Sequence, residues 1–120
     1  MNEYQEQLLD HYHNPRNFGA PKFHVTSSSK LQNLSCGDEI EVFISAKDGK
    51  LDEISFKGEG CSIAIGAASL LYSTLKGEDI EFVKNFKLDE LLEIIGLPLT
   101  TTRIKCANLS LEALKDSIKA

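Results

Sequence analysis

The stretch EIEVFISAKDGKLDEISFK, residues 39–57, predicts the fold class, because apolar and polar side chains alternate on both sides of a short turn. In its first half, Ile40, Val42 and Ile44 occupy every second position, the pattern of a strand that buries one face. Asp48-Gly49 then supplies the turn residues that antiparallel hairpins favour. The predicted strands cover residues 39–47 and 51–57.

The residues before this hairpin predict a helix, a loop and a weaker strand. Leu8 and Tyr12 lie about one helical turn apart and share a face. Pro15 biases the residue before it away from helical geometry, so the helix should end there. The expected elements are a helix over 2–13, a turn-rich loop over 14–21 and an edge strand over about 25–34.

The residues after the hairpin predict helices. Apolar residues from Ile65 to Leu75 fall three or four positions apart, while Gly66 and Ser69 lie on the opposite stripe. We therefore expect an amphipathic helix over 62–76. Further helices are expected over residues 79–84, about 88–95 and 106–118. This order predicts an α+β fold, with helices packed on one face of a small three-stranded antiparallel sheet.

Length and composition limit the possible functions. The 120 residues suit a single domain over 1–120, and a hydrophobic content of 42% argues against disorder. The formal net charge of -5 argues against binding to nucleic acid or a membrane surface, which needs clustered positive charge. The polar, acidic start does not resemble a secretory signal, so we expect a cytoplasmic protein whose thiols stay reduced.

The chain has three cysteines, Cys36, Cys61 and Cys106, an odd number that cannot pair fully within the chain. One interpretation is that all three pack in the core as small hydrophobic side chains. The positions of the three cysteines in the sequence favour a different interpretation. Cys36 lies two residues before Asp38, so both side chains can point to the same side of an extended segment.

Cys61 and Cys106 each lie at the start of an expected helix. A helix N-terminus lowers the pKa of a thiol and favours the thiolate that binds metals and attacks sulfur. Three thiolates and one carboxylate suit zinc, and thiolates also hold iron–sulfur clusters. One harder oxygen ligand should make the site more exchangeable than four thiolates would.

Four blocks of sequence, in order, resemble the iron–sulfur scaffold family of IscU, SufU and the N-terminal domain of NifU. The blocks are Asp10-His11-Tyr12-His13-Asn14-Pro15-Arg16-Asn17-Phe18-Gly19, Cys36-Gly37-Asp38, Gly60-Cys61 with Ala68-Ser69, and Arg103-Ile104-Lys105-Cys106-Ala107 with Leu109. The resemblance covers nearly the whole chain and implies a SufE/NifU-like fold.

The resemblance also implies a shared site. Cys36, Cys61 and Cys106 would bind iron, a transient [2Fe–2S] cluster or zinc, with Asp38 as a labile fourth ligand. A cysteine desulfurase would supply persulfide sulfur, and apo iron–sulfur proteins or cluster carriers would receive the product. Cys106 is the first candidate acceptor by analogy with IscU, and Cys36 is the candidate in the SufU branch.

Two differences between this sequence and the motifs of the scaffold family leave the function open. Lys105 stands where IscU has a histidine, which resembles SufU, yet the chain lacks the SufU insertion between the second and third cysteines. The segment 97–101 also departs from the chaperone-binding motif of IscU. We expect a cluster scaffold that accepts sulfur. The alternatives are a zinc-dependent sulfurtransferase and an interaction domain with a structural zinc.

Overall fold

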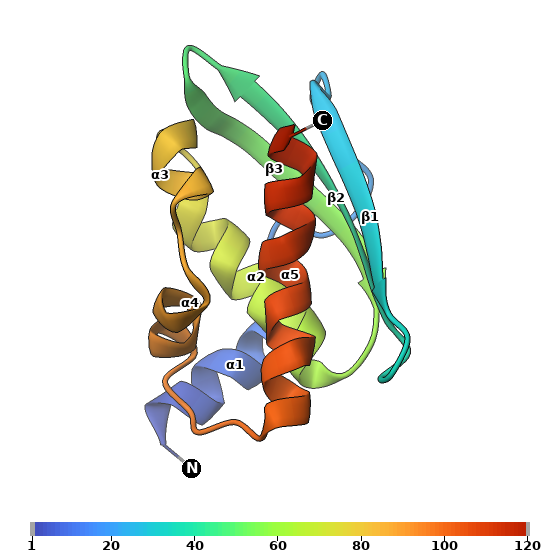
Figure 1. The fold of residues 1–120 in the computed structure, drawn as a ribbon, viewed down its shortest axis with the longest axis vertical. Coiled ribbons are helices and arrows are strands. Elements are labelled where there is room, and N and C mark those ends of the chain that lie inside the picture. Colours follow the sequence, from blue (N-terminus) through green and yellow to red (C-terminus); the bar gives the residue numbers. More distant parts are fainter. Residues whose placement is uncertain (1, 120) are drawn as a thin grey trace.

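The computed structural model describes residues 2–119 and has the predicted α+β architecture (Figure 1). In chain order the elements are α1 (Glu3–His13), β1 (Ser27–Asn33), β2 (Asp38–Lys47), β3 (Lys50–Glu59), α2 (Ser62–Leu75), α3 (Ile80–Lys84), α4 (Leu88–Ile95) and α5 (Thr101–Lys119). The strands form one antiparallel sheet in the order β1-β2-β3. The predicted three-stranded sheet is confirmed.

The β2–β3 hairpin forms as its sequence predicts. Asp48 and Gly49 have φ angles of 54° and 76°, so the turn has the left-handed geometry at both positions that matches the twist of a two-residue hairpin. This turn pairs Lys47 with Lys50, and a bulge between Ser45 and Ala46 then shifts the register by one residue, so that Ile44 pairs with Ile54. A one-residue slip would carry every buried side chain to the other face.

The helices lie on one side of the sheet and enclose the core (Figure 1). Alternate residues of β2, namely Ile40, Val42 and Ile44, are buried beneath them. Burying each such side chain stabilises the fold by about 1.5–3 kcal/mol. α5 packs along β1 and β2, and α2 packs against α5 and α1. None of the described helices combines the length and apolar character that crossing a membrane requires.

The expected polar stripe of α2 is exposed only in part, because α1 covers Gly66 and Ser69. Gly66 and Ser69 are both buried. A Cβ atom placed on Gly66 would come within 2.8 Å of the Leu8 side chain, so the two helices approach too closely for a larger residue. α2 is therefore buried along most of its length, and its buried Ser69 bonds to groups of α1 and the loop that follows it.

The expected start of the last helix is wrong. α5 begins at Thr101 rather than Cys106, because Thr100 ends the preceding loop and its Oγ1 accepts a hydrogen bond from the Arg103 backbone N–H at 3.3 Å. Threonine is a weak helix former but a good N-terminal cap. Cys106 consequently lies in the second turn of α5.

Candidate metal centre

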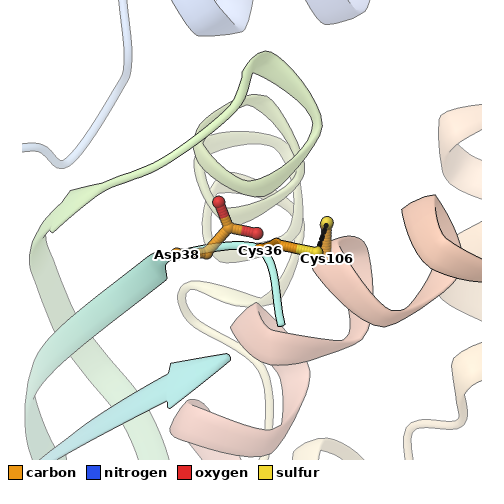
Figure 2. A group of neighbouring side chains, drawn as sticks. All are labelled: Cys36, Asp38 and Cys106. Atoms are coloured by element: carbon orange, nitrogen blue, oxygen red, sulfur yellow. Dashed lines mark hydrogen bonds between the residues drawn. The ribbon is translucent and has the colours of Figure 1, made fainter. Parts of the chain in front are cut away.

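Three predicted ligands converge from two separate segments of the chain (Figure 2). Cys36 lies in the turn between β1 and β2, Asp38 is the first residue of β2, and Cys106 lies in α5. One ligand atom from each residue falls within 4.8 Å of the other two. The Sγ atoms of Cys36 and Cys106 are 3.3 Å apart.

The β1–β2 turn points Cys36 toward α5. The Asn33 carbonyl accepts hydrogen bonds from the backbone N–H groups of Cys36 and Gly37, at 3.2 and 2.9 Å. Gly37 has a φ of 72°, a left-handed conformation that glycine adopts at little cost. The turn therefore reverses the chain within a few residues and leaves Asp38 at the start of β2, beside the thiols.

Asp38 is 1% exposed, which is unusual for a carboxylate. Its Oδ1 accepts a hydrogen bond from the Cys61 backbone N–H at 3.1 Å. Its Oδ2 is buried and has no hydrogen-bond partner among the described residues. A Cβ atom at residue 60 would overlap the carboxyl group, so Gly60 creates the space that Asp38 occupies.

This carboxylate fits a metal site. A buried oxygen without a partner costs folding free energy that a bound cation would recover. Together with two thiols, it supplies three of the four ligands of a tetrahedral ion such as zinc. Cys36, Asp38 and Cys106 thus form a group that could hold a metal ion.

Cys61 is placed differently from the other three. Its side chain is exposed, and its sulfur lies outside the group formed by the other ligand atoms. It is the N-cap residue of α2, and its side chain makes no capping hydrogen bond. The backbone of Cys61 therefore holds Asp38 in place, while its thiol lies at the rim of the site.

The expected lowering of the Cys106 pKa is wrong. Burial raises the pKa of this thiol well above its ordinary value, and the neighbouring Asp38 carboxyl group, the Cys36 thiol and the charge of Cys61 raise it further. The helix dipole has little effect because Cys106 is one turn beyond the first turn of α5. The metal-free site therefore holds a protonated Cys106, and a bound metal must displace that proton.

A polar cluster between α1 and α2 was not predicted. The Ser69 hydroxyl lies 2.7 Å from Nδ1 of His11 and accepts a hydrogen bond from the Arg16 backbone N–H at 2.8 Å. These bonds fasten the loop after α1 to the buried helix. Burial lowers the pKa of His11. In the sequence, these polar residues stand in two of the four blocks that resemble the scaffold family. Periodicity along the chain does not show that the two blocks meet in the fold.

A model of the NifU-like N terminal domain matches residues 3–120. The chain belongs to this family. Among its relatives, the zinc-dependent sulfurtransferase SufU of Bacillus subtilis is 30% identical, and the match covers 96% of this chain and 88% of SufU. The iron–sulfur cluster assembly scaffold protein IscU of Aquifex aeolicus is 33% identical, over 98% of this chain and 74% of IscU.

The solved structures agree on the fold of this NifU-like domain. The N-terminal part of a nitrogen-fixing NifU-like protein from Brucella abortus superposes with a TM-score of 0.74. The match covers 98% of this chain and 91% of that one at 14% identity, which supports the fold alone. The match with SufU spans 132 positions, more than the 120 residues here, so it includes positions that this chain lacks.

Proposed function

We propose that this chain is a scaffold for iron–sulfur cluster assembly, which accepts sulfur and binds iron or a nascent [2Fe–2S] cluster before passing it to apo-proteins. The observation that carries the proposal is the buried Asp38 carboxylate, which has an unpartnered oxygen and lies beside two thiols. The relatives named as IscU scaffolds point to the same function.

The proposed ligands are Cys36, Asp38, Cys61 and Cys106. Three already lie together, and Cys61 must turn inward to complete the set. Two features favour such a movement: the side chain makes no capping hydrogen bond, and residues 58–60 include two glycines. Asp38 would be the ligand that exchanges most readily, because a carboxylate binds soft metals less tightly than thiolates do.

Burial favours Cys36 over Cys106 as the first sulfur acceptor. Cys106 is 3% exposed, whereas Cys36 is partly exposed in a turn. A persulfide carried by another protein could reach Cys36 without opening the core. We propose a cysteine desulfurase as the donor, and apo iron–sulfur proteins or cluster carriers as the recipients. Free thiols suit the cytoplasm, where we expect the protein to act.

A zinc-dependent sulfurtransferase is the second candidate, favoured by the match with Bacillus subtilis SufU. The same four residues would hold zinc until the donor arrives, and one thiol would then relay sulfur without assembling a cluster. This function uses the same site but predicts a different product.

Reconstitution with a cysteine desulfurase, cysteine and ferrous iron tests both functions. A scaffold should develop the visible absorbance of a [2Fe–2S] centre, and Cys36→Ser should abolish it. Asp38→Ala should change the lifetime of the centre, whereas the exposed Asp52→Ala is the matched control and should not. Faster desulfurase turnover with the zinc form and no cluster would support the sulfurtransferase instead.

A further inference from the structure

The two closest thiols of the site are Cys36 and Cys106, which lie on a turn and on a helix 70 residues apart in sequence. Their sulfur atoms need to approach by only about 1.3 Å from the present 3.3 Å to reach the S–S bond length of about 2.05 Å. This short distance between the two sulfur atoms suits thiol–disulfide exchange as well as metal binding.

Sulfur received as a persulfide is at a higher oxidation level than the sulfide of a cluster, so two electrons must be supplied. We propose that Cys36 and Cys106 supply these electrons themselves, by converting persulfide sulfur on Cys36 into hydrosulfide and ending as a Cys36–Cys106 disulfide. This inference rests on the proposed acceptance of sulfur by Cys36 and adds a reductive activity to it.

The step balances within the site. Cys106 first loses its proton, because the thiolate is the nucleophile in such exchange. The thiolate sulfur attacks Sγ of the Cys36 persulfide, a bond forms between the two Sγ atoms, and the bond from Cys36 to the outer sulfur breaks. The outer sulfur leaves as hydrosulfide and takes up the proton that Cys106 carried. The outer sulfur is reduced by two electrons, and the thiol pair is oxidised by two. A dithiol reductant then restores both thiols.

The structure favours attack on the inner sulfur over simple transfer of the outer one. Sγ of Cys36 already contacts Sγ of Cys106, whereas an added outer sulfur can extend toward the exposed side of the turn. Hydrosulfide is also a better leaving group than an alkyl thiolate. Burial of Cys106 keeps external thiols from reaching it before Cys36 reacts.

The test uses the metal-free, fully reduced chain and glutathione persulfide as the donor, without desulfurase or iron. After rapid removal of the donor, free sulfide and intact mass are followed together. We expect roughly one equivalent of sulfide per chain, with a protein mass lower by two hydrogens and a peptide in which Cys36 is joined to Cys106. Failure of a desulfurase to dock would not affect this result.

Three variants make the test specific. Cys106→Ser should keep the persulfide on Cys36 and release only background sulfide, with circular dichroism confirming its fold. Cys61→Ser leaves a single possible intramolecular disulfide, which should still form. Ser35→Ala, an exposed change beside Cys36, is the matched control. A persulfide that persists beside a free Cys106, or moves to it without sulfide release, would overturn the proposal.

Discussion

At the scale of single residues, the site depends on a carboxylate placed where folding alone would not favour it. Asp38 is buried, and only one of its oxygens is hydrogen-bonded within the described chain. Burying an unpaired oxygen costs free energy, so a residue kept only for stability would be better replaced by an apolar one. The cost is consistent with a role in holding a cation.

Gly60→Ala should weaken metal binding without unfolding the protein. The new methyl group would overlap the Asp38 carboxyl group and push it out of line with the two sulfurs. Displacing a ligand in this way should lower zinc affinity about 10–100-fold. Competition with a chromophoric chelator measures the affinity. Glu59→Ala, an exposed neighbour, should bind zinc as the unaltered chain does; equal affinity in both variants would contradict the role given to Gly60.

At the scale of elements, α2 organises the molecule because neighbours cover most of its surface. α1 lies against Gly66 and Ser69, and α5 packs on another side. The N-terminus of α2 carries Cys61, whose backbone N–H holds Asp38. The same helix therefore fastens the loop after α1 through Ser69 and positions the carboxylate of the site.

Ser69→Ala should destabilise the fold. Removing the hydroxyl leaves the Arg16 backbone N–H and the His11 ring without their partner, which should cost about 1–3 kcal/mol in the free energy of unfolding. Urea denaturation measures the change. Thr74→Ala is the control, because Thr74 is an exposed residue whose hydroxyl bonds only to the Leu70 carbonyl of its own helix. A loss no greater than that of the control would show that the loop is held by other contacts.

At the scale of the whole molecule, the hydrophobic core and the proposed metal site have few residues in common. One cluster of buried side chains joins the sheet to the helices, and of the four proposed ligands it includes only Cys106 among its fully buried members. The fold should therefore form without metal, unlike small domains in which metal binding supplies the folding free energy.

Metal removal tests this expectation. Protein treated with a chelator should keep its far-ultraviolet circular dichroism and still unfold cooperatively, with a lower midpoint because a bound ion stabilises the native state by mass action. Collapse of the secondary structure on chelation would instead support a structural zinc. Cys61→Ser, treated in the same way, reports whether the exposed thiol contributes to the shift.

Alkaline pH should destabilise the metal-free protein. Burial raises the pKa values of Cys106 and Tyr72 above their ordinary values of 9.0 and 10.0, so the unfolded chain loses these protons first. The associated stability is complete below about pH 9 and is lost as the pH rises beyond it.

Urea midpoints between about pH 8 and about pH 11 would measure this loss. Tyr72→Phe should flatten the upper part of the curve, although it also removes the 2.7 Å hydrogen bond from Tyr72 to the Ser110 carbonyl and so lowers stability at every pH. An unchanged slope in this variant would assign the alkaline transition to other groups.

The sequence by itself was enough for the class of fold and for naming the candidate ligands. Period-two alternation in residues 40–44 and the turn at Asp48-Gly49 predicted the central hairpin, because both signals are local. Cys36 and Asp38 do lie together, but the turn at Gly37 brings them together, not the alternation of an extended segment that their spacing predicted. These features depend on neighbours along the chain, which the sequence displays directly.

Only the tertiary structure decided which thiols meet and how they are buried. Cys36 and Cys106 come together because α5 packs across β1 and β2, and Cys61 lies at the N-cap position of α2 with an exposed side chain. The raised pKa of Cys106 and the burial of Ser69 follow from contacts between distant segments. Periodicity cannot report such contacts, because a helix face looks the same in sequence whether water or another helix covers it.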